Sequence, residues 1–422
     1  MKVKVSEVAV LNRQTLGKKH SFSTIQYLDT GSITDGIITG FQKFTVGDDD
    51  IPSRAQRLVK NNTIVYSTVR PRLRHYGILR NPSENTVVST GFVTIDANED
   101  KIYPYYLYCH LIKPETIEYF ASIADTAVSS YPSIKPEDLG NLEIEIPVDL
   151  AIQKKKAKVI EYINNKIEIN NRIIAELEAM AKTIYDYWFI QFDFPNAEGK
   201  PYRSSSGEMV WNEQLKREIP KGWSVNPLPK HCQIIDCLHS EKPSLVFENE
   251  DYYLLQLDNL IDNGLISIAN KYYVSKEMYV LWTSRIEVVE GDLVITNAGR
   301  VGAVARIPKY IKAGIGRNMT AIRPNDVPAC FLYYYFTSSD FARQIKMNTD
   351  SGSFFGSLNV RGIKELKIIL PPKNMYAILN KFEDYVSPLR SKIELLAQEN
   401  LELTKLRDWL LPVLMNGQVT VE

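Results

Sequence analysis

The chain of 422 residues has few cysteines, no net charge and no long apolar run. Its four cysteines, Cys109, Cys232, Cys237 and Cys330, are too few and too scattered for a disulfide framework, which favours a reducing compartment. Lys plus Arg and Asp plus Glu each number 50, which disfavours a polybasic coat for nucleic acid but leaves room for a local basic face. The hydrophobic content of 44% is that of a globular protein, and the length indicates two or three domains.

Segments that would direct the chain into or across a membrane are also missing. The N-terminus, MKVKVSEVAV, has no apolar core of signal-peptide length. The densest apolar and aromatic cluster, FLYYYF at 331–336, is far shorter than a membrane span. These absences predict a cytoplasmic protein with no membrane partner.

Sequence patterns for common catalytic chemistry are not found. There is no G-x-x-x-x-G-K-[ST] for ATP, and GIGRNM at 314–319 lacks the third glycine of a dinucleotide site. There is no Asn/Asp-Pro-Pro-aromatic tetrapeptide of the kind that amino-group DNA methyltransferases use. AEGK at 197–200, after Asp186, reads better as a turn than as a nuclease site, and HCQIIDCLH at 231–239 has cysteine spacing outside that of structural zinc. We therefore predict no catalytic residue and no metal site.

What the sequence does contain is an internal repeat. The segment YPSIKPEDLGNLEIEIP at 131–147 aligns without gaps with FGSLNVRGIKELKIILP at 355–371. Other segments recur in the same order, and it is this preserved order that makes a tandem duplication credible. The recurring pairs are 27–38 with 254–266, 61–70 with 290–300, and 103–111 with 328–336.

A long helical pattern follows each copy of the repeat. Apolar residues recur at spacings of three and four, with one Asn in each stripe, which is typical of a helix–helix seam. A plain core helix is the alternative for each stripe. In an antiparallel pair Asn170 would face Asn400 and Trp188 would lie near Phe382, while Pro388 should kink or break the second helix. The predicted seam comprises Ile160, Ile163, Ile167, Asn170, Ile174, Leu177 and Ile184 in the first helix and Phe382, Val386, Leu389, Ile393, Leu396 and Asn400 in the second.

The predicted fold class is α+β. Two β-rich mixed α/β domains are separated by two long helices, which pack as an antiparallel coiled coil in a pseudo-twofold tandem repeat. The expected segments are a first domain at 1–149, a long helix at 150–190, a linker at 191–222, a second domain at 223–372, and a second long helix with tail at 373–422.

Charge is unevenly distributed within the two domains. No acidic residue occurs from Ile51 to Ser83 or from Leu293 to Asn325, and the two windows occupy corresponding places in the repeat. Arg and Lys neutralise phosphates, and Arg and Asn are the residues that most often read base edges. For any single residue a solvated basic face is the plain alternative. The predicted DNA-contacting residues are Arg54, Arg57, Ser67, Arg70, Arg72, Arg74 and His75 in the first window and Asn297, Arg300, Arg306, Arg317 and Asn318 in the second.

Taken together, the chain resembles the specificity subunit of a type I restriction–modification system. The most specific parts are the linker GKPYRSSSGEMVWNEQLKREIPKGWSV at 199–225, above all IPKGW at 219–223, and the strand–proline–helix units that end at Pro147 and Pro371. The resemblance extends over nearly the whole chain, including the order of domain, helix, domain, helix.

The resemblance implies a subunit without catalytic activity that binds double-stranded DNA. Each domain would be a target-recognition domain for one half of a bipartite sequence, and the helix pair would set the number of unread base pairs between the halves. The chain would be a pseudo-symmetric monomer in a hetero-oligomer with two modification subunits and with restriction subunits. No cofactor is expected on this chain, because S-adenosylmethionine, ATP and Mg²⁺ would bind to the partner subunits, whose complex methylates adenine N6 and cleaves DNA.

Two rival interpretations remain from the residues alone. One is a single-chain nuclease or methyltransferase whose site carries no familiar pattern. The other is a protein-interaction scaffold that uses its coiled coil and aromatic clusters without binding DNA.

Overall fold

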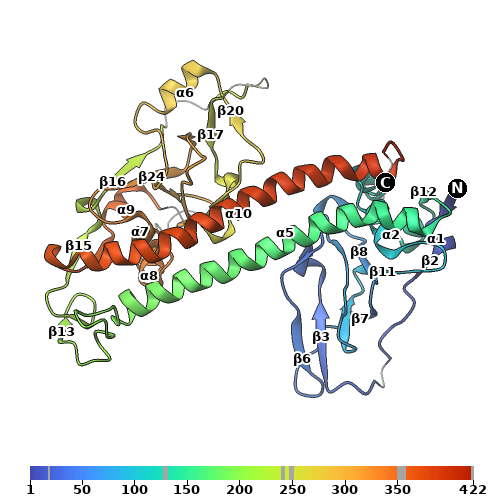
Figure 1. Ribbon diagram of the computed structural model, residues 1–422, viewed down its shortest axis with the longest axis horizontal. Helices are drawn as coiled ribbons and strands as arrows, with labels where there is room; N and C mark the ends of the chain where they lie inside the picture. The colour runs from blue at the N-terminus through green and yellow to red at the C-terminus, as the bar shows by residue number, and fades with distance from the viewer. Residues whose placement is uncertain (18–19, 127–131, 239–242, 247–250, 349–357, 420–422) are drawn as a thin grey trace. The chain divides into compact units, whose positions relative to one another are not determined.

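The structure, a computed structural model, describes residues 1–17, 20–126, 132–238, 243–246, 251–348 and 358–419 (Figure 1). The chain divides into two compact units, which are described separately. Unit 1 comprises Met1–Ile169 with Glu402–Glu422, and unit 2 comprises Asn170–Leu401. The division falls inside both long helices, α5 (Leu150–Tyr185) and α10 (Ala377–Met415), so that each helix contributes one segment to each unit.

Two four-stranded sheets form the body of unit 1. One has the order β2–β11–β8–β9, entirely antiparallel, and the other has the order β6–β3–β10–β7, in which β3 and β10 are parallel. Two short pairs, β1–β12 and β4–β5, complete the strands. The bounds are β1 Lys2–Lys4, β2 Ala9–Leu11, β3 Thr24–Leu28, β4 Ile33–Thr34, β5 Ile37–Ile38, β6 Gln42–Thr45, β7 Ala55–Leu58, β8 Ile64–Ser67, β9 Tyr76–Ile78, β10 Thr86–Ser89, β11 Phe92–Ala97 and β12 Glu143–Glu145.

Short helices cover the core of unit 1. They are α1 (Val5–Val8), α2 (Pro104–Leu111), α3 (Pro114–Thr126) and α4 (Pro136–Gly140). Pro begins α2 and α4 at the first helical position, where its missing N–H has no intrahelical partner to lose. All eight residues of α2 are buried, which makes PYYLYCHL the centre of the core between the sheet and the first long helix.

Unit 2 repeats this arrangement, except that its second sheet has three strands and, among the described residues, no counterpart of β7. The sheet β16–β24–β21–β22 is antiparallel, and in the sheet β20–β17–β23 the central strand pairs in parallel with β23. Short pairs β15–β25, β18–β19 and β13–β14 accompany them. The bounds are β13 Met209–Asn212, β14 Arg217–Pro220, β15 Ser224–Pro227, β16 Cys232–Asp236, β17 Tyr253–Leu255, β18 Leu260–Ile261, β19 Leu265–Ile266, β20 Tyr272–Tyr273, β21 Leu293–Thr296, β22 Val304–Arg306, β23 Gly314–Ile315, β24 Met319–Pro324 and β25 Lys367–Leu370.

The helices of unit 2 also match those of unit 1 in order. Helix α6 (Lys276–Trp282) is added, and α7 (Ala329–Phe336), α8 (Ser339–Asn348) and α9 (Val360–Lys364) take the places of α2, α3 and α4. The α9 helix starts at an Asn359 cap, whose side chain accepts a hydrogen bond from the Gly362 N–H at 2.8 Å. The matching order of the first sheet, the shared parallel strand pair of the second sheet and the matching helix order confirm the repeat predicted from the sequence. Ser357, which the alignment pairs with Ser133, lies outside the described residues.

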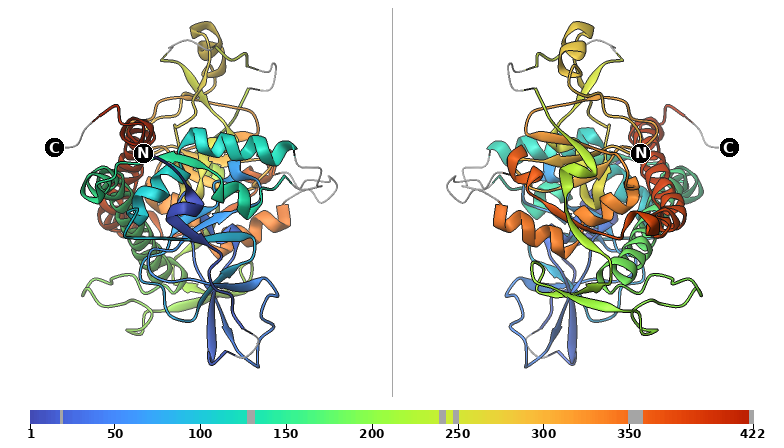
Figure 2. Two further views of the ribbon diagram at one scale, coloured as in Figure 1. Left: turned by 90° about the vertical axis from the view of Figure 1, so that its right-hand side faces the viewer. Right: turned by 90° about the vertical axis from the view of Figure 1, so that its left-hand side faces the viewer.

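The two long helices pack antiparallel within each unit (Figures 1 and 2). In unit 1 the Lys156 ammonium donates to the Leu414 carbonyl at 3.0 Å. In unit 2 the Asn170 amide donates to Asn400 Oδ1 at 2.9 Å, and the rings of Trp188 and Phe382 have centroids 6.0 Å apart. The expected pairings of Asn170 with Asn400 and of Trp188 with Phe382 are therefore confirmed.

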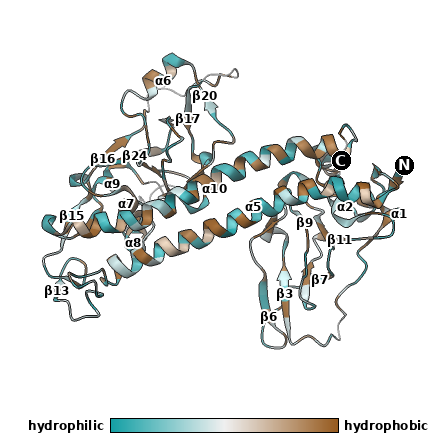
Figure 3. Ribbon diagram, viewed as in Figure 1, coloured by the Kyte–Doolittle hydropathy of each residue, from teal (hydrophilic) through white to brown (hydrophobic). Residues whose placement is uncertain are grey.

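None of the thirteen residues predicted for the helix seam is exposed. Apolar residues recur along both helices, as the hydropathy colouring of Figure 3 shows. Leu177 packs on a small cluster that includes Ile174, Ile393 and Leu396. The seam is buried, with Asn170 fully so, at Ile160, Ile163, Ile167, Asn170, Ile174, Phe382, Val386, Ile393 and Leu396, and partly buried at Leu177, Ile184, Leu389 and Asn400.

Of the two effects expected at Pro388, a break does not occur, while a kink stays a prediction. Helix α10 is described over its whole length and runs as one helix from Ala377 to Met415. A proline removes one backbone hydrogen bond and disturbs the preceding turn. The buried neighbours Val386 and Arg390 hold the helix on both sides of the proline. Near the same end of the seam, α5 passes into five residues of π-helix, Asp186–Ile190, before the linker.

Candidate nucleic-acid interface

The first basic window brings two segments to one turn. Arg54 is exposed in the loop before β7, and its carbonyl accepts from the Thr90 N–H at 2.8 Å. Thr68, two residues before Arg70, donates its backbone N–H to the Gly91 carbonyl at 3.0 Å. The turn at 89–91 therefore anchors the segments of Arg54 and Arg70 in the same part of unit 1.

A strained turn presents three of the predicted cations. Arg70 (φ 48°) and Arg74 (φ 57°) both have left-handed backbones, on either side of the 3₁₀ turn Pro71–Leu73. Non-glycine residues persist in this region when the surrounding structure holds them there, so contacts with the rest of the domain must stabilise this turn. The Arg70 N–H donates to the Pro132 carbonyl at 3.0 Å, which is one such restraint.

The cations of this turn differ in how they are neutralised. Arg70 is exposed and has no ion-pair partner among the described residues. Arg72 binds Glu118 and Asp125 of α3, each at 2.9 Å, and these hydrogen bonds raise the pKa of its guanidinium. Arg74 lies 3.4 Å from an Asp35 oxygen. Arg70 is therefore the cation of this turn most available to a phosphate.

The other predicted residues of the first window are less accessible. Ser67 is buried at the end of β8, and the Arg57 side chain is half-buried on β7, opposite Val88. His75 is held by the Ile33 carbonyl at 2.7 Å from its Nδ1. These three residues help to build the surface, and the structure gives Ser67 no access to a ligand.

The second window gathers three loops of unit 2. The Asn297 N–H donates to the Asn318 carbonyl at 2.8 Å, and its amide bonds the Thr320 hydroxyl at 3.0 Å. Arg317 and Asn318 are exposed beside it, and Arg317 has no ion-pair partner among the described residues. Arg300 is exposed too, but it pairs with Asp262 at 2.8 Å and donates to the Leu260 carbonyl. The loops at 260–264, 296–303 and 316–318 thus form one polar surface.

Arg306 does not belong to this surface, and its assignment as a DNA contact is corrected. The side chain is buried at the end of β22 and binds both carboxylate oxygens of Glu394 on α10, at 2.8 and 3.0 Å. A buried, paired guanidinium attaches the sheet to the long helix and cannot reach a phosphate.

Reasoning from the sequence missed the residues that attach the second domain to the helices. Arg390 is fully buried, and it contacts Glu178 of α5, Glu394 of α10 and the loop at 263–264. The sequence did contain a signal for these residues. Arg390 and Glu394 form a charged pair at positions i and i+4, on the same helix face as the seam residues Val386 and Ile393.

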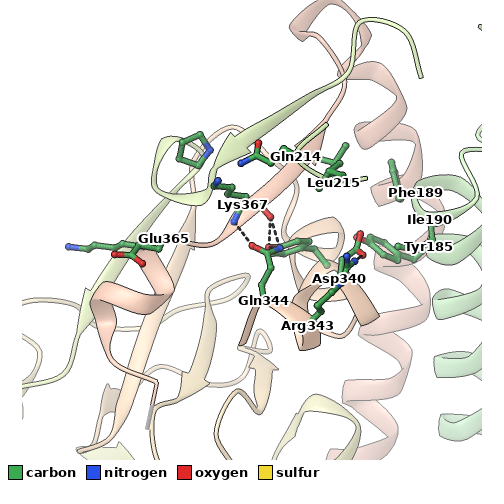
Figure 4. A pocket seen from close by; sticks show the side chains of 14 residues that line it. Tyr185, Phe189, Ile190, Gln214, Leu215, Asp340, Arg343, Gln344, Glu365 and Lys367 are labelled. Carbon is green, nitrogen blue, oxygen red and sulfur yellow. Dashed lines mark hydrogen bonds and ion pairs between the residues drawn. The ribbon is translucent and has the colours of Figure 1, made fainter. Parts of the chain in front are cut away.

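A cavity of about 650 Å³ lies elsewhere in unit 2 (Figure 4). It is bounded by the end of the first long helix, the linker and α8, and side chains of both charges line it. Gln344 donates to the Lys367 carbonyl at 2.9 Å and accepts from the Lys367 N–H at 2.8 Å at one wall. No residue predicted to contact DNA lines this cavity.

All four cysteines are buried. Cys232 and Cys237 lie in separate core clusters, burial raises the pKa of the Cys232 thiol to about 12, and His239 lies outside the described residues. Among the residues that the structure describes, no helix is both long enough and apolar enough to span a bilayer.

The duplicated domains, the paired helices and the two polar surfaces define a class of tandem DNA-reading proteins, and comparison with known families identifies the class. Residues 2–179 and 261–405 match the family model of the type I restriction modification DNA specificity domain. The chain therefore belongs to the family of type I restriction–modification specificity subunits.

Individual relatives agree with this assignment. The chain is 25% identical over 454 residues to the specificity subunit of the type I restriction enzyme HindI of Haemophilus influenzae, covering 95% of each chain. It is 26% identical over 367 residues to the MjaIX specificity subunit of Methanocaldococcus jannaschii, covering 87% of this chain and 79% of that one. In fold it is similar to the S subunit of a type I restriction–modification system from M. genitalium, with a TM-score of 0.57, 18% identity and coverage of 98% and 96%.

Proposed function

We propose that this chain is a non-catalytic reader of a bipartite DNA sequence and a scaffold for modification subunits. The observation that carries the proposal is the duplication itself. Two domains of closely similar topology each present exposed arginines with no carboxylate partner among the described residues, Arg54 and Arg70 in one and Arg317 in the other. Two surfaces with different residues on the same repeated fold can recognise two different half-sites. Arg neutralises phosphates, and both Arg and Asn read base edges.

The partners in this proposal are double-stranded DNA, two modification subunits and restriction subunits. The names of the relatives place them in type I restriction enzymes, which supports an assembly of this kind. S-adenosylmethionine, ATP and Mg²⁺ would act on the partner subunits, where adenine N6 methylation and ATP-dependent cleavage would occur. The two long helices, each unbroken, would keep the half-sites at a constant spacing.

Mapping of methylated adenines tests the proposal directly. The chain is expressed with its modification subunits in a host that lacks other adenine methylation, and the genome is sequenced for N6-methyladenine. The expected result is one bipartite, non-palindromic motif with a constant spacer. Random methylation, or none with active modification subunits, would contradict the proposal.

Two further measurements address the rival functions. The purified chain alone is incubated with DNA containing the motif, Mg²⁺ and S-adenosylmethionine, and we expect neither cleavage nor methylation. Activity of the lone chain would favour an enzyme. A DNA titration in the presence of modification subunits should saturate, whereas a flat titration would favour a scaffold that does not bind DNA.

A further inference from the structure

A buried group of four charges lies where the second domain meets the long helices. It consists of Arg306 on β22, Glu178 on α5, and Arg390 and Glu394 on α10, all within unit 2. Arg390 is fully buried, and its Nε donates to Glu394 Oε1 at 3.2 Å. Two guanidinium groups and two carboxylates balance, so the group is neutral overall. We name these four residues the Arg390 cluster.

Arg390 also binds the backbone of a surface loop. Its Nη1 donates to the Asn263 carbonyl and to the Tyr333 hydroxyl, each at 3.1 Å, and its Nη2 donates to the Gly264 carbonyl. The guanidinium lies 4.3 Å from the centre of the Tyr333 ring. The loop packs directly against this ring. A Cβ atom added at Gly264, whose φ is +60°, would lie 2.2 Å from the Tyr333 hydroxyl. Only glycine fits this close approach.

The same loop carries a partner of the candidate DNA surface. Asp262, next to Asn263, pairs with Arg300 at 2.8 Å, and Arg300 also donates to the Leu260 carbonyl. A continuous series of contacts therefore runs from Glu178 through Arg390 to the loop and on to Arg300. Every member of the series belongs to unit 2.

The corresponding loop of unit 1 lacks this attachment. Its tip, Asp35–Gly36, is held within its own domain, since Asp35 accepts from the Tyr76 hydroxyl at 2.9 Å and pairs with Arg74. A cavity of about 260 Å³ is lined by Asp35, Asn164 of α5 and Arg407 of α10. Among the residues that the structure describes in unit 1, no ion pair joins this loop to either long helix.

We propose that Arg390 is a positioning residue: it holds the loop at 260–266 on the long helices and so determines where the second domain presents Arg300 to DNA. The inference rests on the proposed function. Removing the guanidinium would take one hydrogen-bond donor from each of four acceptors, Glu178, Glu394 and the carbonyls of Asn263 and Gly264. This loss is costly at a buried position even though Arg306 still binds Glu394 and Tyr334 still binds Glu178. The loop would then be released from the helices, and base discrimination by the second domain would fall while that by the first stays.

The test compares variants in the methylation assay described above. Arg390→Lys keeps the charge but not the fork of donors, and Arg390→Met removes both. Tyr333→Phe is a milder change that removes only the hydroxyl between Arg390 and the Asn263 carbonyl. Lys392→Met, an exposed cation two residues away on the same helix, is the matched control. Arg70→Ala, in the first domain, identifies which half of the motif each domain reads.

The readout is the ratio of methylation at the full motif to methylation at sites with one altered base in a given half. For Arg390→Lys and Tyr333→Phe, thermal unfolding first verifies that the variants are folded. In these two variants we expect this ratio to fall about tenfold in the half read by the second domain, which matches the loss of one good base contact. The ratio in the other half should stay unchanged. Lys392→Met should leave both halves unchanged.

The outcomes separate the two proposals. If the unaltered chain directs no motif, the proposed function fails. If the motif appears but both folded variants keep full discrimination in the second half, or lose it equally in both halves, the positioning role of Arg390 is overturned and the proposed function stands. Arg390→Lys restoring part of the loss seen in Arg390→Met would support the role.

Discussion

The two domains have one topology but differ in how they are attached to the long helices. In unit 2 the attachment combines an apolar cluster with buried charges, because Arg306 and Arg390 bind carboxylates on both helices. In unit 1 the ion pair between domain and helix, Arg80 with Glu161 of α5, is partly exposed, and Ile160, Leu411 and Met415 pack in one apolar cluster with the buried helix α2. Burial of apolar surface has no directional preference, whereas hydrogen-bonded charges hold one geometry. The comparison teaches that duplication preserved the strand order while the attachments diverged.

The buried helices α2 and α7 show the same divergence at single positions. The repeat pairs 103–111 with 328–336, and near the end of these segments unit 1 has His110 where unit 2 has Tyr335. The Tyr335 hydroxyl donates to the Lys367 carbonyl at 2.7 Å. His110 is buried with neither ring nitrogen hydrogen-bonded to a described residue. The equivalent position is thus hydrogen-bonded in the second domain but has no hydrogen bond from its ring to a described residue in the first.

The largest expected effect is from Phe382→Ala. The Phe382 ring lies within 6.4 Å, centre to centre, of five aromatic rings of unit 2, including those of Trp188 and Phe189. Its loss should cost about 3–5 kcal/mol of unfolding free energy. Hydrogen exchange should show lost protection in unit 2 with little change at 1–149. Tyr385→Ala, at an exposed aromatic on the same helix, is the control and should cost less than about 1 kcal/mol. Equal losses from both variants would refute the role of the cluster.

A second effect is a dependence of folding stability on pH that originates at His110 in unit 1. Burial, with help from Lys113 and Lys156, lowers the pKa of His110 to about 3. Between pH 6.5 and pH 3 the unfolded chain therefore binds a proton that the folded chain does not, and stability falls as pH falls through that window. The loss approaches about 1.4 kcal/mol per pH unit, or about 2 kcal/mol from pH 6.5 to pH 5.

Chemical denaturation of the unaltered chain and of His110→Phe at pH 7 and pH 5 measures this effect. The variant should lose less stability than the unaltered chain on acidification, by about 2 kcal/mol. Tyr335→Phe in the second domain should leave the pH dependence as it is. An identical acid sensitivity with and without the imidazole would show that His110 is not its source.

A third effect concerns the asparagine pair, Asn170 and Asn400, in the helix seam. The buried Asn170 amide donates to Asn400 and to Glu399, each at 2.9 Å. Asn170→Ala removes these bonds and should cost about 1–2 kcal/mol. The double variant Asn170→Ile, Asn400→Ile should regain that stability but fix the helix register less firmly. Cross-linking of cysteines placed along the two helices would detect additional registers, and a single register in the double variant would contradict this role of the asparagines.

The smallest effect distinguishes two arginines of one turn. Arg70→Ala should weaken DNA binding and reduce the slope of log Kd against log salt concentration by about one, as expected for one lost phosphate contact. Arg72→Ala should have a smaller effect, because Glu118 and Asp125 already neutralise its guanidinium. A larger loss for Arg72→Ala would mean that DNA displaces those carboxylates.

The repeat and the helix seam could be predicted because they depend on apolar spacing. Apolar residues recur at spacings of three and four in both helices, for example at Ile160 and Ile174 in the first and at Ile393 in the second. Only a helix places such positions on one face. The collinear order of strands and turns likewise follows from local patterns. The break expected at Pro388 did not occur, because packing on both sides of a proline can outweigh its local effect.

The polar site was predictable only in part. A window without acidic residues correctly marked exposed Arg54, Arg70 and Arg317, but it also included Arg306, which is buried. Whether a cation faces solvent or a carboxylate depends on residues far away in the chain: Glu394 is 88 positions from Arg306, and Asp125 is 53 from Arg72. Spacing along the chain does not report such pairs.

The amino-acid order by itself determined that this protein is doubled, that each copy is followed by a long amphipathic helix, and that each copy contains a stretch rich in arginine. These properties follow from periodicity and composition, which act locally. Tertiary structure alone decided which arginines are exposed at the surface, and that Arg306 and Arg390 of unit 2 are buried against Glu178 and Glu394. The physical reason is that a charge takes its role from the groups that surround it after folding.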